Sequence, residues 1–260
     1  MADRNRVEEL AGRMPEKLPT VKKAWTMLSY ILNDNCRIYS ERFFRGGHNS
    51  LLPFVQYLAL NPLPTPQEKK RIVTGIYLTI MSGIFAGAEA RMGNFSRNDV
   101  KPARSFPLKK IAALARNHYG ILGLDSLFVR HLDLALNIAH NGITIDGNPD
   151  ELQRDHIFPR SMLEKEGYDY RKINHYSNFH FLRGKDNGNK SDIAPHLWFR
   201  NPGKDIQPYS DRDLEDRLLT WDLLEPGSFS RMIEYRTAKI KDRAEDLFGL
   251  SSEEFDALFI

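Results

Sequence analysis

Hydrophobic positions along the first 140 residues recur at helical spacing. Apolar side chains fall on one face of the stretches 18–45, 51–60, 67–91, 104–117 and 125–139. Before the third of these stretches, Thr65 and Pro66 supply an N-cap and a proline for the first helical turn. Gly120 and Gly142 follow the ends of the last two stretches. We therefore predict an all-helical domain over residues 1–140.

The pattern changes near residue 150. The runs 152–158 and 178–182 are short and apolar, and they predict two strands. The stretch 187–199 suits a helix in which Pro195 causes a kink or a local stop. The order of elements expected here is therefore strand, strand and helix.

Helical spacing returns over residues 210–224 and 230–250, where apolar side chains again share one face. The predicted fold class is mainly α. A helical scaffold over 1–140 is followed by an embedded motif of two strands and a helix over 141–200. Helices over 201–260 then pack on the scaffold.

Composition narrows the class of protein. The 260 residues include 37 Lys and Arg against 34 Asp and Glu, which gives a net charge of +3. This small excess predicts that, without a partner domain, the chain binds DNA weakly and with little salt dependence, since few phosphates can be neutralised. The single cysteine, Cys36, excludes intramolecular disulfides and cysteine-rich zinc sites. The charged N-terminus lacks an apolar signal core, and the run 76–86 is too short to cross a bilayer, so we expect a cytoplasmic protein with no membrane segment.

The side chains of greatest chemical interest lie between residues 155 and 190. Asp155-His156-Ile157-Phe158-Pro159 ends the first predicted strand, Asn178 opens the second, and Asn187-Gly188-Asn189-Lys190 opens the helix. An Asp-His pair taken alone is typical of an ordinary protein surface. The three pieces in this order, with an N-x-x-K ending, form a more specific pattern.

This order resembles the HNH, or ββα-metal, nuclease motif. A D-H-I-x-P start is usual in the C-terminal nuclease domain of GmrSD-type, modification-dependent restriction endonucleases. The HNH domain of CRISPR effector nucleases shares that start and the N-x-x-K ending. The stretch between His156 and Asn178 is longer here than in the CRISPR domain, so residues 160–177 contain an insertion, whereas the spacing from Asn178 to Asn187 matches. The resemblance covers residues 151–192 and implies a metal-dependent endonuclease that nicks DNA in restriction or phage defence.

The resemblance also implies a role for each residue. His156 is expected to be the general base, and Asp155 and Asn187 are expected to hold Mg²⁺ or Mn²⁺. Asn178 would tie down the loop that aims the histidine, and Lys190 would face the same phosphate. The chemistry is consistent, because Mg²⁺ takes oxygen ligands and keeps several waters, and a neutral imidazole titrates near working pH.

The sequence also permits other metal ligands. Asn189 competes with Asn187 as the metal ligand if the helix begins later, and Asn187 can instead be a plain N-cap. His175, His180 and His196 also permit a histidine-based metal site. No pair among these histidines has the i, i+4 spacing of a zinc motif, so surface positions are favoured for them.

Basic residues near the motif are candidates for phosphate contacts. Arg154, Arg160 and Arg183 can each form a bidentate contact with a phosphate. The stretch 230–250 has a second, basic face, for which exposure to solvent is the more ordinary outcome than phosphate binding. That face carries Arg236, Lys239, Lys241 and Arg243.

Two further functions compete with DNA cleavage. One is a non-catalytic nucleic-acid-binding or protein-interaction module, and the other is an RNA-cleaving enzyme with the same chemistry. The presence of Asp155, His156 and Asn187 together favours an enzyme, because a decayed site is expected to lose one of them. The GmrSD resemblance also implies an NTP-using, ParB-like domain. No Gly-rich phosphate loop occurs in this sequence, so a larger protein or a partner subunit would supply that domain.

Overall fold

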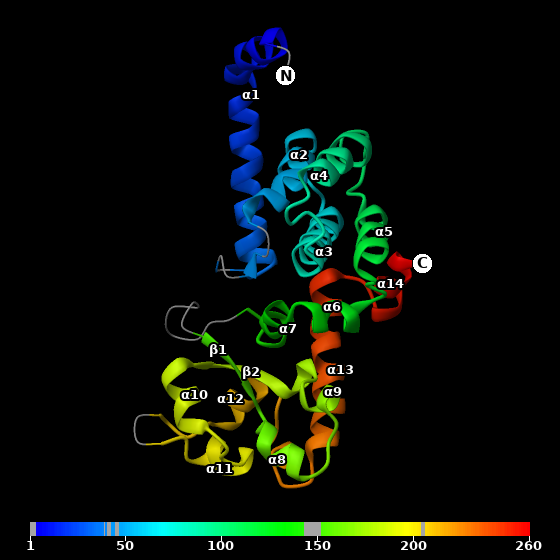
Figure 1. Ribbon diagram of the computed structural model, residues 1–260. Helices are drawn as coiled ribbons and strands as arrows, with labels where there is room; N and C mark the ends of the chain where they lie inside the picture. The colour runs from blue at the N-terminus through cyan, green and yellow to red at the C-terminus, as the bar shows by residue number, and fades with distance from the viewer. Residues whose placement is uncertain (1–3, 39, 41–42, 45–46, 143–151, 204–205) are drawn as a thin grey trace. The chain divides into compact units, whose positions relative to one another are not determined.

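The computed structural model describes residues 4–38, 40, 43–44, 47–142, 152–203 and 206–260, and it is mainly helical (Figure 1). The predicted fold class, mainly α, is confirmed. Within these residues, the only strands are β1 (Leu152–His156) and β2 (Phe179–Arg183), which pair as one antiparallel sheet. No helix in the described ranges is both long and apolar enough to span a membrane.

The chain divides into two compact units. The first comprises Met1–Cys36 and Phe44–Gly120, and the second comprises Arg37–Phe43 and Ile121–Ile260. The domain boundaries at residues 140 and 200 that we drew from the sequence stay predictions. Residues 143–151, at the start of the predicted 141–200 segment, lie outside the described residues.

The first unit is built from helices and helical turns. They are α1 (Arg4–Tyr30), η1 (Ile31–Asn35), η3 (His48–Leu51), α2 (Leu52–Leu60), α3 (Pro66–Ser82), α4 (Glu89–Phe95), η4 (Ser96–Val100) and α5 (Leu108–Tyr119). The predicted start of α3 is confirmed, because the Thr65 side chain accepts a hydrogen bond from the Glu68 N–H and Pro66 is the first helical residue. The predicted end at residue 91 is wrong. Gly83 adopts the left-handed conformation, with φ of 67°, and caps the helix after Ser82.

Close packing explains the glycine inside α3, Gly75. A Cβ atom on Gly75 would lie 2.5 Å from the ring of Phe106, and that ring stacks on Phe54 with centroids 4.7 Å apart. Only a residue without a side chain allows this approach. The glycine inside the helical pattern therefore marks the place where α3 meets the aromatic core of the first unit.

The second unit carries both strands and the remaining helices. In addition to β1 and β2, its elements are α6 (Leu124–Arg130), α7 (Leu132–Ala139), α8 (Arg160–Lys165), α9 (Tyr170–Ile173), η6 (Tyr176–Asn178), α10 (Gly184–Lys190), α11 (Pro195–Arg200), α12 (Asp211–Asp216), η7 (Trp221–Leu223), α13 (Phe229–Phe248), α14 (Ser252–Asp256) and η8 (Ala257–Phe259). The single helix predicted over 125–139 is interrupted at His131, whose side chain accepts from the Leu134 N–H and so caps α7. The helix predicted over 230–250 is confirmed as α13.

Two predicted helices of this unit are shorter than expected. The stretch 187–199 forms two helices, because Ser191 has a φ of 44° after α10 and Pro195 begins α11 instead of kinking a longer helix. The helix predicted over 210–224 ends at Asp216. In both cases the apolar spacing continues past the point where the backbone turns.

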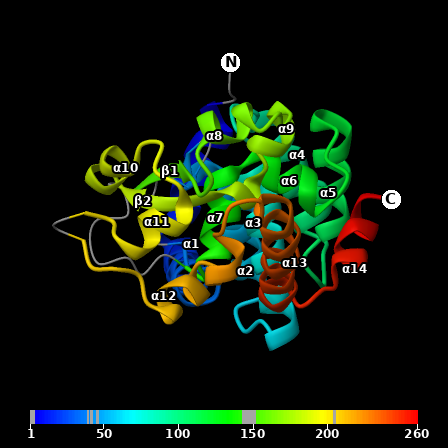
Figure 2. The ribbon, with the colours of Figure 1, turned by 90° about the horizontal axis from the view of Figure 1, so that it is seen from below.

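The sheet is attached to a hydrophobic core within the second unit. Ile157 and Phe158, directly after β1, are buried with Leu182 of β2 and Trp198 of α11. Phe229 of α13 belongs to the same cluster. Figures 1 and 2 both show α10 and α11 beside the two strands. Burial on these sides fixes the end of β1, where the candidate site lies.

Candidate active site

The antiparallel pairing of β1 and β2 fixes which side chains share a face of the sheet. Asp155 lies opposite His180, and His156 lies opposite Phe179. Residues directly opposite each other point to the same face, whereas neighbours along a strand point to opposite faces. Asp155 and His156 therefore leave β1 in opposite directions, and His180 lies on the side of the carboxylate.

Two buried side chains hold Asp155. Its Oδ2 atom lies 2.6 Å from Lys190 Nζ and 2.9 Å from His180 Nε2. Lys190 and His180 are fully buried, and the Asp155 side chain keeps 12% of its exposure. Lys190 also donates to the main-chain oxygen of His156. Lys190, the last residue of α10, thus anchors that helix to the end of β1. Its ammonium group faces a carboxylate instead of open solvent.

Burial decides which of these groups carry charge. Desolvation lowers the pKa of His180 to about 4, despite the neighbouring carboxylate, so the ring is neutral at pH 7 and donates through Nε2–H. Burial raises the pKa of Asp155, but the hydrogen bond from His180 and the charge of Lys190 outweigh it and leave that pKa below its usual value. Burial lowers the pKa of Lys190, against the pull of Asp155. Lys190 and Asp155, 2.6 Å apart, form the ion pair of this site.

Asn187 lies on α10, one turn before Lys190. Its Nδ2 donates to Gln153 Oε1 over 3.0 Å. Gln153 and Asp155 are two residues apart on β1 and so share one face of the strand. Asn187 and Lys190 therefore contact that face at successive positions. Asn189, the alternative ligand, is exposed and makes no hydrogen bond within the described residues.

Asn174 orients the ring of His156, a contact that the sequence did not indicate. Asn174 Nδ2 donates to the Tyr170 carbonyl over 2.9 Å, which directs Oδ1 toward His156 Nε2 at 3.1 Å. An amide oxygen only accepts, so Nε2 carries the proton and Nδ1 holds the lone pair. The ring also packs on Phe179, with centroids 4.2 Å apart. Burial lowers the pKa of His156, which keeps the ring neutral at pH 7.

Asn178 ties the segment after β1 to the segment before β2. Its Oδ1 accepts from the Phe158 N–H over 3.0 Å, and its Nδ2 donates to the carbonyls of Phe158 and Ile173 over 3.2 and 2.9 Å. Its own carbonyl accepts from the Ile157 N–H over 2.7 Å. The side chain is fully buried. This geometry supports the loop-fixing role that the resemblance implied.

We expect Asn178→Ala to lower the free energy of unfolding by about 3 kcal/mol, because each buried polar group left unpaired costs about 1–3 kcal/mol. The change leaves the Phe158 N–H without its acceptor and two carbonyls without their donor. Urea unfolding followed by circular dichroism measures the loss. Asn189→Ala, on an exposed side chain, is the matched control. Equal stabilities of the two variants would contradict this role.

The basic face predicted for residues 230–250 requires a correction at Arg236. This side chain is fully buried, and its Nη1 donates to the carbonyls of Ser177 and Phe179, on either side of Asn178. Desolvation lowers its pKa to about 9. Arg236 therefore fixes the same segment as Asn178, and its burial keeps it away from the surface that a phosphate could reach. The signal was present in the sequence, because Arg236 follows the apolar Ile233 by three positions.

The other cations of that face bind groups of the protein. Lys239 pairs with Asp242 over 3.0 Å, and Lys241 pairs with Asp125 over 2.8 Å. Arg243 donates to the Ala139 carbonyl. Because these three cations are engaged by groups of the protein, they do not form a continuous basic surface along α13.

The three arginines considered for DNA contacts each pair with a carboxylate. Arg154 lies 2.7 Å from Asp133 of α7, and Arg160 lies 2.6 Å from Glu164. Arg183 lies 2.8 Å from the buried carboxylate of Asp186. Only the Arg160 pair is more than half exposed on the arginine side and nearly half on the acid. Arg160 is therefore the one of the three best placed to exchange its partner for a phosphate.

A histidine-based metal site finds no support. Within the described ranges, no group of three His, Cys, Asp or Glu side chains is arranged to hold a metal ion. His175 Nδ1 accepts from the Ser177 N–H, and His180 is occupied by Asp155. The expectation that His180 lies on a surface is wrong, because its side chain is fully buried.

The remaining oxygen atoms suit a hard divalent cation. Asp155 uses Oδ2 for both of its contacts, and Asn187 uses Nδ2, so neither Oδ1 atom bonds to any residue in the described part of the chain. One carboxylate oxygen and one amide oxygen match the preference of Mg²⁺, which keeps several waters. The ammonium of Lys190 repels a cation at the same carboxylate. The donor set fits Mg²⁺ or Mn²⁺, and Lys190 opposes its charge.

Comparison with known proteins assigns no family to this chain. No protein-family model matches it, and no curated protein and no solved structure matches it either. The arrangement of the side chains around β1 is therefore the basis for assigning a function.

Proposed function

We propose that this chain is a metal-dependent endonuclease of the HNH type, which hydrolyses phosphodiester bonds of DNA and nicks one strand per active site. The observation that carries the proposal is the state of His156, whose Nε2 is occupied by Asn174 and whose Nδ1 is left as a base. The neighbouring residue, Asp155, supplies a carboxylate. The order of β1, β2 and α10 supports a ββα-metal motif. The resemblance of residues 151–192 to the nuclease domain of GmrSD-type restriction endonucleases supports a role in restriction or phage defence.

Asp155 and His156 point to opposite faces of β1, so this mechanism places the scissile phosphate at the end of the strand, where the two side chains diverge around it. There His156 Nδ1 takes a proton from the attacking water. The low pKa of the ring keeps that nitrogen unprotonated at pH 7, as a general base requires. Asp155 and Asn187 would hold Mg²⁺ or Mn²⁺, which supplies stabilisation of negative charge on the leaving oxygen. Asn178 holds the backbone that aims His156, and Lys190 balances the charge of Asp155.

A non-catalytic nucleic-acid-binding module is the second candidate, and one observation favours it. Lys190 already neutralises Asp155, so the buried charge at this site is balanced without any metal. Metal dependence of cleavage separates the two functions. The same assay with an RNA substrate distinguishes DNA cleavage from RNA cleavage. The experiment is needed because the site acts on the phosphate and does not contact the sugar.

Asn187→Ala tests the proposed metal site. The change removes one of two oxygen ligands, so we expect half-maximal nicking of supercoiled plasmid to need a roughly tenfold higher Mg²⁺ concentration, equivalent to about 1.4 kcal/mol of lost binding. Excess Mg²⁺ or Mn²⁺ should restore part of the rate. The readout is the conversion of supercoiled to open circular plasmid across a titration of the metal.

Asn189→Ala is the control, since it removes the same side chain two residues away on an exposed position. Its metal titration should coincide with that of the unaltered protein. A shift in Asn189→Ala with none in Asn187→Ala would transfer the ligand role to Asn189. Identical titrations for both variants would contradict a metal ligand on this segment.

A further inference from the structure

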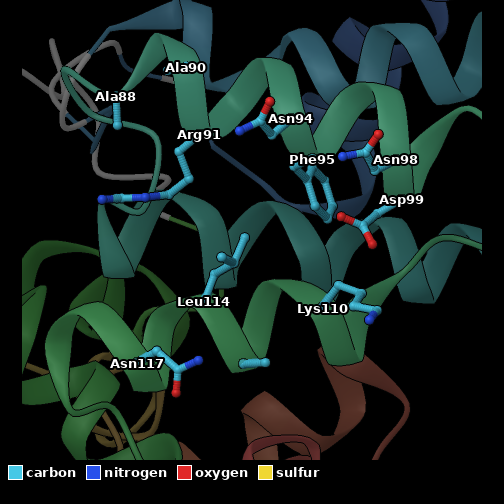
Figure 3. A pocket seen from close by; sticks show the side chains of 11 residues that line it. Ala88, Ala90, Arg91, Asn94, Phe95, Asn98, Asp99, Lys110, Leu114 and Asn117 are labelled. Carbon is cyan, nitrogen blue, oxygen red and sulfur yellow. The ribbon is translucent and has the colours of Figure 1, made fainter.

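A groove of about 580 Å³ lies in the first unit, between the continuous helical segment α4–η4 and the helix α5 (Figure 3). Asn94, Asn98 and Asp99 line it from α4–η4, and Lys110 and Asn117 line it from α5. Alanines on both helices leave the space open. The volume falls within the range of about 300–1,000 Å³ that is typical of small-ligand sites.

The lining combines amide groups with an apolar floor. Phe95 and Leu114 contribute apolar surface between the two rows of polar side chains. Arg97 Nη2 donates to Asn94 Oδ1 over 2.6 Å, so the Nδ2 of Asn94 stays available as a donor. Asn98 and Asn117 are exposed, and each offers both a donor and an acceptor. Such paired groups match the edges of nucleobases.

The segment that carries this groove is rich in positive charge, and two of its cations, Arg91 and Lys110, line the groove itself. Residues 91–116 contain seven Arg and Lys and one acidic residue, Asp99, whereas the whole chain has a net charge of only +3. Lys101, Lys109 and Lys110 are exposed and make no ion pair within the described residues. The small net charge therefore conceals a basic segment, and the weak salt dependence expected from composition does not follow for this surface.

We propose that the groove between α4–η4 and α5 binds a nucleic-acid strand with an unstacked base. Basic residues of the segment neutralise the phosphates, and the amides contact the edge of the base. Asp99 favours a nucleotide over a simple anion, because a carboxylate repels phosphate but accepts from the exocyclic amino group of a base. An unpaired, unstacked base offers its Watson–Crick edge to a site of this volume, whereas in a paired duplex that edge is occupied by the partner base. This site is independent of His156 and of the proposed nuclease chemistry.

The test is fluorescence anisotropy with a labelled single-stranded DNA oligonucleotide, in EDTA so that no cleavage occurs. Lys110→Ala should lower affinity severalfold and reduce the slope of log affinity against log salt by about one phosphate contact. Asn98→Ala should lower affinity with the slope unchanged. Lys22→Ala, which removes an exposed lysine from α1 of the same unit, is the matched control. Circular dichroism establishes that each variant is folded.

Equal affinity and slope for Lys110→Ala and Lys22→Ala would overturn the proposal. So would tighter binding of a duplex of the same length, or displacement of the oligonucleotide by an equal concentration of a mononucleotide or of inorganic phosphate. His156→Ala should bind the oligonucleotide like the unaltered protein. Absence of plasmid nicking by the unaltered protein, with groove-dependent binding of the oligonucleotide retained, would contradict the nuclease proposal alone.

Discussion

Replacement of His156 by alanine should reduce the rate of plasmid nicking by about 10²- to 10⁴-fold, the usual contribution of a general base. The variant keeps the Asp155 and Asn187 oxygens, so its requirement for metal should not change. DNA binding should also be unaffected, because a neutral ring adds little to the attraction of phosphate. Single-turnover nicking and a gel shift with the same DNA measure the two effects separately.

His196→Ala is the matched control for this experiment, since His196 lies on α11 and has no contact with His156 among the described residues. Asn174→Ala should give a smaller loss of rate, because it frees the ring without removing the base.

The direction of the pKa shift of His156 also predicts how the nicking rate depends on pH. The pKa of His156 is lowered by burial, so the acidic limb of the rate profile should lie below the ordinary imidazole value of about 6.5. Undiminished nicking by His156→Ala would exclude His156 as the base.

The second large effect concerns Lys190, and it does not depend on any activity. Lys190→Met removes one partner of a buried ion pair and leaves the carboxylate of Asp155 without its cation. Breaking such a pair costs about 3–5 kcal/mol, because an uncompensated charge stays buried. We expect urea unfolding at pH 7 to show a loss of that size. Methionine matches the lysine side chain as far as its Cε atom, so the packing of the stem changes little.

The double variant Asp155→Asn, Lys190→Met provides the control. Its amide oxygen can still accept from His180 Nε2–H, and no charge is left unpaired, so it should regain much of the lost stability. The folded-state pKa of Asp155 lies below its unfolded value, so the pair stabilises the protein above about pH 3.9 and loses this contribution as the pH falls through the depressed pKa. The double variant lacks that step. Equal stability of Lys190→Met and the unaltered protein would show that the pair contributes little.

Local signals in the sequence predicted helices better than they predicted where helices end. Thr65 and Pro66 began α3 as expected, because an N-cap and a first-turn proline act within a few residues. Hydrophobic spacing could not show that Gly83 takes a left-handed conformation or that His131 separates two helices. Periodicity reports which face is buried, and that face continues across a break in the backbone.

In the candidate site, too, some residues could be predicted from the sequence and others could not. Asp155 and His156 were found because they are adjacent and their types suit the chemistry. The partner of His156, Asn174, lies 18 residues away inside the insertion, where nothing in the sequence marks it. The burial of Lys190 and His180 around Asp155 depends on the pairing of β1 with β2 and on the position of α10. Such contacts are set by the fold, and residue type alone does not reveal them.

The most direct test of metal-dependent cleavage is incubation of the purified protein with supercoiled plasmid in the presence of Mg²⁺, Mn²⁺ or EDTA. We predict that open circular DNA accumulates with either metal and that EDTA abolishes it. His156→Ala, purified in parallel, should leave the plasmid supercoiled on the same timescale and so exclude a contaminating nuclease. Plasmid that stays supercoiled with both metals, in protein shown to be folded by circular dichroism, would contradict the proposed nuclease activity.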